Sequence, residues 1–491
     1  MRGALVHSPR YKWWVFGAVG LGTFTSVVDH GSLNVALPTI AAHFDTDLPT
    51  VQWVVVGYAL TISALLLPMG RLSDVIGRKQ VYLSGFVLFV IGAAVAATSG
   101  HIVTLILSRV LQGCGAAMVQ GTGMAITTST FGPEERGKAL GSHVSVVGTG
   151  SITGPALGGL LVSNLGWEWV FYANALGAMA ALTAAFAILD KGRLQQAGTR
   201  DRFDWPGAAL STGVLVVFLS AMTSGPRSGW DSPVVALGMI AFVVLLGAFI
   251  WWELRSPNPM LELRLFKVRL FSMGAAAGFI AFMGTSSLIF LMPFYLQTVA
   301  GYSPAQVGLI MMPNALCFII LGPISGRLSD RYGFRPFNVA GLLLITGGLF
   351  LLSRIDETTP LWTVMTGMVL TSGGMGTFNS PNNSSILSTV ALGRYGVVSA
   401  LLNLVRNSAN VTSIAMSTAI VTATMASMGQ TPSLDAVADA PAAFTAGMRT
   451  ACLMLASLLV VGVVVSFLKG GRRMDPVAEP HPSNAPGTGN G

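Results

Sequence analysis

The chain has 491 residues, of which 52% are hydrophobic and only 10% are charged. Soluble domains carry about 25% charged residues, so this composition excludes an ordinary soluble protein and indicates an integral membrane protein. The formal net charge of +8 does not indicate a nucleic-acid-binding protein, because the basic residues are scattered along the chain instead of forming one patch.

Apolar runs long enough to cross a bilayer recur along the chain. A helix needs about 20 apolar residues to cross a hydrocarbon core roughly 30 Å thick, and the first run is too long for the core of a signal peptide. We therefore expect an all-α membrane protein with 14 transmembrane helices, at 13–37, 51–69, 80–98, 102–127, 139–162, 168–189, 206–224, 233–252, 270–296, 304–324, 336–353, 361–388, 396–424 and 446–468.

The Lys and Arg residues are distributed unevenly between the two sides of these spans. If the N-terminus is cytoplasmic, only Arg227, Arg354 and Arg449 of the 28 Lys and Arg lie on the opposite side, Arg449 at the outer end of the last span, while Arg109 and Arg406 lie inside spans. Basic loops are retained on the cytoplasmic side of a membrane. We expect a multi-pass protein of the cytoplasmic membrane with both termini in the cytoplasm, and the bias also supports the even number of spans.

One loop sequence occurs twice. Gly70–Lys79 reads GRLSDVIGRK and Gly326–Arg335 reads GRLSDRYGFR, and each copy separates two long apolar runs. A six-helix unit has therefore been used twice, with spans seven and eight inserted between the copies. Repeat-built transporters place the substrate between the halves, near the bilayer midplane. We expect a cytoplasmic N-terminal segment (1–12), an N-terminal six-helix bundle (13–189), a cytoplasmic linker (190–204), two inserted helices (205–254), a C-terminal six-helix bundle (255–469) and a disordered cytoplasmic tail (470–491).

Span one contains Asp29, the only acidic residue well inside any expected span. A carboxylate at that depth costs on the order of 3 kcal/mol on insertion scales, so it should be paired, protonated or facing water. We interpret Asp29 as a proton-carrying or substrate-binding group. The alternative is a carboxylate that only braces helix packing.

Span four carries Arg109. At 1.5 Å per residue, Asp29 lies roughly 20 Å from the inner end of span one and Arg109 roughly 10 Å from the outer end of span four, which are similar depths. The two side chains can pair if these spans are neighbours, and protonation of Asp29 would then release Arg109. Burial and a neighbouring guanidinium act on a carboxyl pKa in opposite directions, so the sequence leaves the resting protonation open. A static structural ion pair is the alternative.

Span five contains the pattern GxxxGPxxGG, with Gly154 and Pro155 at its centre. Glycines four residues apart let a second helix approach closely, and Pro155 removes a backbone donor and favours a kink. We expect a close helix contact at this point.

A polar stripe runs along span thirteen, at positions that share one helical face. No acidic residue lies inside any other expected span of the C-terminal half, so three partners remain open for its arginine: backbone carbonyls, Asp29 across a cavity, or an anionic group of a substrate. Span twelve adds polar residues near its inner end, and Met and Phe side chains in spans nine and ten indicate either simple packing or an adaptable apolar pocket. The expected cavity residues are Asn403, Arg406, Asn407 and Asn410 of span thirteen, Asn379 and Asn383 of span twelve, and Tyr58 and Gln112.

The repeated loops place Asp74 and Asp330 at helix ends beside Arg78 and Arg335. There a carboxylate can pair with an arginine or meet a helix N-terminus, and breaking such contacts would free one half to rock against the other. Arg78 also keeps its loop on the cytoplasmic side.

The three cysteines, Cys114, Cys317 and Cys452, lie within apolar runs and show no metal-ligand spacing. We expect three free buried thiols, no metal and no cofactor. The chain lacks GxSxG, HExxH and P-loop motifs in a suitable context, so an enzyme is not indicated.

Taken together, VVDHGSLNVALP in span one, QWVVVGY in span two, the two GRLSD loops, RVLQG in span four, GPALGG in span five and WEWVFYAN at the start of span six resemble the 14-helix drug:proton antiporter branch of the major facilitator superfamily. The resemblance runs nearly end to end. It implies the major facilitator fold of two six-helix bundles, here with two inserted helices, and identifies the span-five pattern with an antiporter signature that acts as hinge and seal.

The resemblance implies a proton-coupled exporter of drugs or other lipophilic compounds, of the kind that confers antibiotic resistance, working by alternating access as a monomer. Asp29 would carry the proton and Arg109 would be its partner. Two residues depart from the pattern: His30, which titrates near neutral pH and can tune coupling or simply satisfy Asp29, and Glu168, at a position more often basic. A lipid, siderophore or organic-anion transporter of the same fold is the alternative, and a membrane sensor without transport is a remote one.

Overall fold

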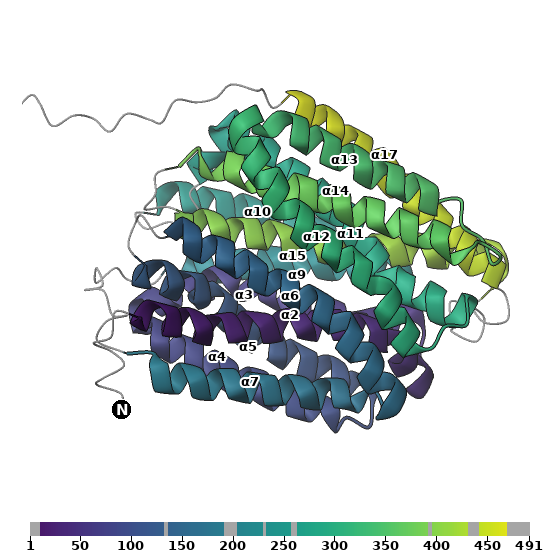
Figure 1. Ribbon diagram of the computed structural model, residues 1–491, viewed down its shortest axis with the longest axis horizontal. Helices are drawn as coiled ribbons and strands as arrows, with labels where there is room; N and C mark the ends of the chain where they lie inside the picture. The colour runs from purple at the N-terminus through teal and green to yellow at the C-terminus, as the bar shows by residue number, and fades with distance from the viewer. Residues whose placement is uncertain are drawn as a thin grey trace, which may run out of the picture.

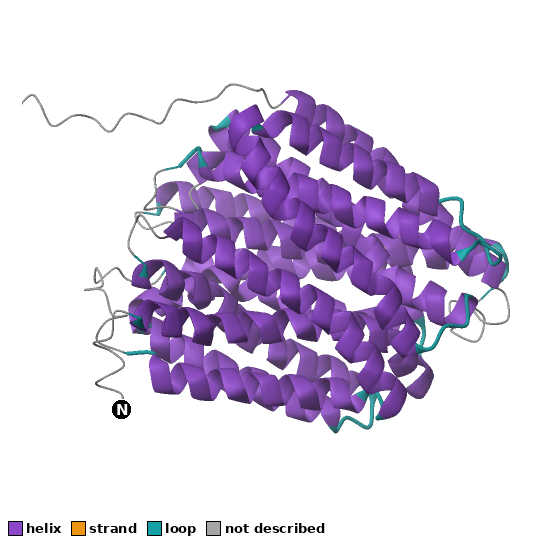
Figure 2. Ribbon diagram, in the orientation of Figure 1, coloured by secondary structure: helices purple, strands orange, loops and turns teal. Residues whose placement is uncertain are grey.

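The computed structural model describes residues 10–131, 136–190, 204–228, 232–256, 263–390, 395–430 and 441–468. Within these ranges every regular element is a helix, as Figure 2 shows. Most of the expected 190–204 linker and the whole 470–491 tail lie outside the described residues. The helices are α2 (Tyr11–His43), α3 (Leu48–Ile76), α4 (Arg78–Ala97), α5 (Ile102–Thr130), α6 (Arg136–Asn164), α7 (Glu168–Ile188), α9 (Trp205–Ser228), α10 (Pro233–Arg255), α11 (Arg269–Phe294), α12 (Pro304–Tyr332), α13 (Phe334–Leu352), α14 (Leu361–Leu387), α15 (Tyr395–Ser427) and α17 (Pro441–Leu468), with short turns η2 (Leu263–Lys267) and η3 (Tyr295–Val299) before and after α11.

The helices form two halves that repeat one packing pattern. In the N-terminal half, α4 packs on α5 and α7, and α2 packs on α6 and α7. In the C-terminal half, α13 packs on α14 and α17, and α11 packs on α15 and α17. These are the same neighbours in the same order. Figure 1 shows α2 to α7 on one side and α11 to α14 with α17 on the other, with their long axes roughly parallel. The inserted helices α9 and α10 pack on each other, and α9 also contacts α3 and α15.

Twelve of the described helices are long and apolar enough to cross a membrane. The other two long helices, α2 and α14, are as long but carry more polar side chains, such as Asp29 and His30 in α2 and Asn382 and Asn383 in α14. Lower hydropathy in these two helices is expected if they face the protein interior and not lipid. The all-helical fold with fourteen long helices is confirmed.

The repeated GRLSD segments, expected in loops, lie within the last turns of helices α3 and α12. Helix α3 continues through Arg71 to Ile76 and α4 begins at Arg78, so that Gly77 alone separates them. In the second copy Gly333 alone separates α12 from α13. Both glycines have positive φ, 114° and 83°, a region that disfavours other residues. A single left-handed residue therefore makes each turn.

The expectation of three buried thiols is wrong for two of the cysteines. All three are free, but only Cys452 is buried, and Cys114 and Cys317 keep part of their surface accessible. An apolar run does not say which side of its helix faces the protein, so residue type alone could not separate these cases.

The two halves meet along α6 with α12 and along α3 with α15. We call the end of the bundle where α2 ends and α3 begins the distal end. There the Gln297 side chain donates a 2.8 Å hydrogen bond to the Val35 carbonyl, and the Ala305 backbone N–H donates a 2.9 Å bond to Ser163 Oγ. The distal end is therefore held closed by contacts between the halves.

Candidate functional site

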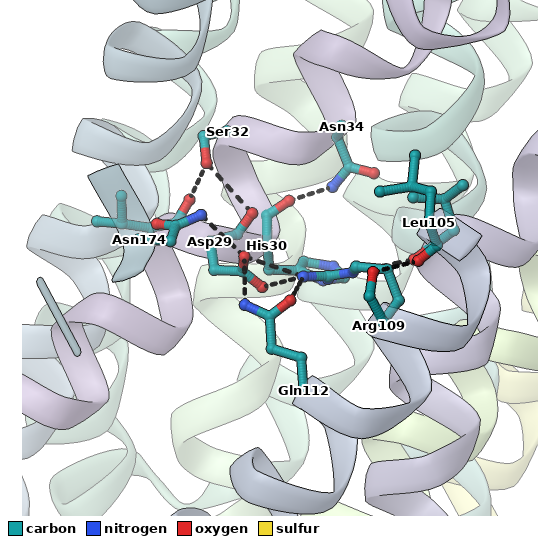
Figure 3. A network of polar contacts seen from close by, with 11 residues as sticks. Asp29, His30, Ser32, Asn34, Leu105, Arg109, Gln112 and Asn174 are labelled. Carbon is teal, nitrogen blue, oxygen red and sulfur yellow. Dashed lines mark hydrogen bonds and ion pairs between the residues drawn. The ribbon is translucent and has the colours of Figure 1, made fainter. Parts of the chain in front are cut away.

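Asp29 lies near the middle of α2 and is fully buried. Its carboxylate accepts hydrogen bonds from side chains of two other helices. Arg109 Nη1 lies 3.0 Å from both carboxylate oxygens, Asn174 Nδ2 donates at 2.8 Å, and Gln112 Nε2 donates at 3.4 Å. Figure 3 shows the three side chains converging on Asp29. Asp29 and Arg109, which were predicted to pair because they lie at similar depths, are therefore in direct contact.

Arg109 is also fully buried and is held by more than Asp29. Its Nε donates a 3.1 Å hydrogen bond to the Val54 carbonyl of α3, and its Nη1 also contacts Gln112 Oε1 one turn along α5. The guanidinium carbon stands 4.1 Å from the centroid of the Tyr58 ring, a cation–π distance. Tyr58 and Gln112, expected in the cavity, therefore belong to the Asp29 site.

The network joins α2, α3, α5 and α7, all in the N-terminal half. Every hydrogen bond to the Asp29 carboxylate is donated to it, which is the arrangement that suits an ionised carboxylate. Protonation would cancel the charge that Arg109 pairs with. Leaving one member of a buried ion pair alone costs about 3–5 kcal/mol, so the network as it stands favours the ionised carboxylate.

The glycines of α6 form the wall behind this site. A Cβ on Gly154 would lie 3.0 Å from Gly31 Cα, and one on Gly31 would lie 2.9 Å from Pro155 Cδ. A Cβ on Gly158 would lie 2.5 Å from Ser32 Cα. Side chains at these positions would force α6 away from α2, beside Asp29. The close helix contact expected at Gly154 and Pro155 is therefore made by α2.

His30 is not part of the carboxylate network. Its backbone carbonyl accepts a 2.8 Å hydrogen bond from Asn34 Nδ2, and no hydrogen bond joins the His30 ring to Asp29 among the described residues. The ring lies within electrostatic range of both Arg109 and Arg406.

The polar residues of α14 and α15 are not one cluster. Asn383 Nδ2 donates a 3.3 Å hydrogen bond to Asn379 Oδ1, so these two amides satisfy each other. On α15, Asn403, Arg406 and Asn410 each keep part of their surface accessible, while Asn407 Nδ2 is buried and makes no hydrogen bond within the described part of the chain.

Of the two expected gating pairs, the described side chains include only Asp330 with Arg335, and no ion pair joins these two. The side chain of Asp74 lies outside the described residues, so its pairing with Arg78 stays a prediction. Arg78 Nη1 donates a 3.3 Å hydrogen bond to the Ala125 carbonyl of α5. Asp330 is exposed, and the Arg335 guanidinium stands over the Phe467 ring, 4.2 Å from its centroid.

Two members of the site were not predicted as functional. Asn174 appeared in the sequence analysis only within the segment WEWVFYAN, which resembles the family. An amide in an otherwise apolar span could have indicated a functional residue. Val54 contributes through its carbonyl, which no side-chain pattern reveals. The described residues contain no group of three His, Cys, Asp or Glu side chains able to hold a metal.

Comparison with known proteins gives consistent matches. Residues 19–414 match the model of the Major Facilitator Superfamily. The chain is 32% identical over 398 residues to the riboflavin transporter RibZ of Clostridioides difficile, covering 81% of this chain and 86% of that protein. It is 31% identical over 388 residues to the multidrug resistance protein Stp of Mycobacterium tuberculosis, covering 79% and 71%. A bacterial homologue of the human lysosomal transporter Spinster, in an inward-facing and unoccupied conformation, superposes with a TM-score of 0.63 at 18% identity, covering 94% of this chain and 97% of that one.

Proposed function

The chain belongs to the Major Facilitator Superfamily, and on that premise we propose that this membrane transporter is a proton-coupled exporter of lipophilic small molecules. The observation that carries the proposal is the fully buried Asp29–Arg109 pair, because a proton can change the charge of Asp29 and thereby the partner of Arg109.

The proposed coupling uses the four-helix network as a switch. With Asp29 ionised, Arg109 is tied to α2 by the carboxylate and to α3 by the Val54 carbonyl. A proton on Asp29 removes the first tie and leaves a buried cation that needs another partner. The network then loosens between α2, α5 and α7, and the N-terminal half is free to change its packing against the C-terminal half.

The conformation fits one stage of alternating access. The halves are joined at the distal end by the Gln297–Val35 and Ser163–Ala305 hydrogen bonds. On the proposed topology, with both termini in the cytoplasm, the distal end is the outer side of the cytoplasmic membrane. Rearrangement at Asp29 would have to break these distal contacts before substrate could leave.

Relatives support a small-molecule cargo without identifying it. Stp is a multidrug resistance protein and RibZ a riboflavin transporter, so sequences this similar serve different substrates. We propose a lipophilic small molecule as cargo, protons as the coupled ion and a monomer as the working unit.

The test uses proteoliposomes with an acidic lumen and a pH-sensitive dye inside. Lipophilic cations, neutral drugs and organic anions are added outside, to the wild type, to Asp29→Asn and to Asp45→Asn. Asp45 is an exposed loop carboxylate with positive φ, a conformation that Asn tolerates well, and it serves as the matched control.

We expect at least one compound class to release protons from the lumen in the wild type and in Asp45→Asn, and not in Asp29→Asn. Substrate movement without any proton movement, or an unchanged response in Asp29→Asn, would contradict the proposal.

A further inference from the structure

Arg406 is a cation within the α15 span for which the Asp29 mechanism has no use. Its side chain keeps part of its surface accessible, so it is not enclosed in packed core. No ion pair or hydrogen bond holds its guanidinium within the described part of the chain. This sets it apart from Arg109, which is fully enclosed by its partners.

No carboxylate among the described side chains pairs with Arg406. The helices that pack against α15 are α3, α5, α9, α11, α14 and α17. Across their ranges the sequence contains a single acidic residue, Asp74, in the last turn of α3. Helices α2 and α6 contribute only Asp29, which is already bonded to Arg109. A desolvated charge without a partner is costly, so a bound anion would stabilise Arg406.

Two histidines of the N-terminal half, His30 of α2 and His143 of α6, lie within electrostatic range of Arg406. The Nδ1 atom of His143 is buried and makes no hydrogen bond in the described structure. Helix α15 itself contacts α3 and α5 of the N-terminal half. Arg406 therefore stands at the seam between the halves, where a repeat-built transporter holds its substrate.

Arg406 shares one face of α15 with Asn403, Asn407 and Asn410, and apolar residues lie elsewhere on the same turns. Leu404 packs against an N-terminal cluster that includes Tyr58 and Leu66, and Leu402 packs against a cluster that includes Phe271 of α11. A ligand anchored at Arg406 would thus have amides and apolar side chains within reach. Inorganic anions would gain nothing from the apolar contacts, whereas an organic anion with a hydrophobic body would.

We propose that Arg406 is the anchor of a substrate site for organic anions, a carboxylate or sulfonate carried on an apolar body. The inference rests on the proposed export function and names its substrate class. The energetics also favour export. A monoanion leaving the cell and a proton entering it both move down an inside-negative potential, at about 2.3 kcal/mol per charge per 100 mV.

The experiment compares head groups on one apolar body. Binding of 1-naphthaleneacetate, its neutral amide and 1-naphthylmethylammonium to purified full-length protein is measured by tryptophan fluorescence, and proton release is measured in the proteoliposomes. The variants are Arg406→Gln, Arg406→Lys and the matched control Arg449→Gln. Arg449 is exposed, and its Nε donates to the Ser353 carbonyl, far from the seam.

We expect the wild type and Arg449→Gln to bind the carboxylate at least tenfold more tightly than the amide or the ammonium compound. A charge-assisted hydrogen bond corresponds to roughly a ten- to hundredfold change in affinity. Arg406→Gln should bind the carboxylate at least tenfold more weakly than the wild type does, with unchanged binding of the other two compounds, and Arg406→Lys should keep part of the preference for the carboxylate. If Arg406→Gln does not fold, Arg406→Lys still tests the site.

The two proposals fail in different ways. Equal binding of the three head groups, unchanged carboxylate binding by Arg406→Gln, or competition by inorganic phosphate as strong as by the carboxylate would overturn the organic-anion site. If the amide or the ammonium compound causes Asp29-dependent proton release in the same assay, the proposal of a proton-coupled exporter is still supported. Arg406-dependent carboxylate binding without proton release in any protein would support the site and overturn proton coupling.

Discussion

The Asp29–Arg109 pair predicts a specific pattern of stabilities for a double-mutant cycle. Asp29→Asn keeps the shape of the side chain but leaves the Arg109 charge buried beside an amide, and Arg109→Gln leaves the carboxylate with only the Asn174 and Gln112 donors. Each single change should lower the free energy of unfolding by about 3–5 kcal/mol, because an uncompensated buried charge remains.

The double variant should lose less free energy of unfolding than the sum of the losses in the two single variants. It places two neutral amides where the ion pair was, in a network that still contains Gln112 and Asn174. We expect a coupling energy of about 2–3 kcal/mol, near the upper end for directly contacting residues.

The assay is denaturant unfolding in detergent micelles, followed by the fluorescence of the tryptophans, at pH 8 so that a carboxyl left alone is not rescued by a proton. Asp45→Asn should stay within about 0.5 kcal/mol of the wild type, as surface changes usually do. Additive single effects, or losses under about 1 kcal/mol, would refute the reasoning that the pair is both tightly coupled and desolvated.

Three further predictions concern structure around the site. Gly154→Val should destabilise the protein by about 1–3 kcal/mol, since its Cβ would stand 3.0 Å from Gly31 Cα and overpack the α2–α6 contact; thermal unfolding measures this, and Gly247→Val, at a position with open space, is the control. Asp47→Ala should cost about 1 kcal/mol in the same assay, because Asp47 Oδ1 caps α3 by accepting from the Thr50 backbone N–H. Hydrogen bonds from Thr359 and Thr358 lower the pKa of Asp356. The turn should thus be most protected above about pH 4, and the protection factor of the Thr358 amide should fall as the pH falls through the lowered pKa. Asp356→Ala should show no such step.

The sequence alone determined the fold class and the first two members of the site. Spans of about 20 apolar residues and the duplicated GRLSD segment are sufficient for a two-fold helical membrane protein, because burial in lipid leaves the backbone few alternatives. Asp29 and Arg109 could be matched because a charge deep in a span needs a partner at the same depth, and depth follows directly from position along a helix.

Tertiary structure decided everything that depends on how the helices are rotated about their axes. Each residue turns the helix by about 100°, so a small uncertainty in rotation decides whether Asn174 meets Asp29, whether Cys114 is buried, and whether Arg335 finds Asp330 or the Phe467 ring. The bond from Arg109 to the Val54 carbonyl is of the same kind, since a backbone acceptor leaves no mark in the sequence. The isolation of Arg406 could be suspected from the missing acids of the C-terminal half, but only the packing of α15 against α3 and α5 placed it at the seam, because contacts between halves are set by side-chain fit and not by the apolar pattern of either helix.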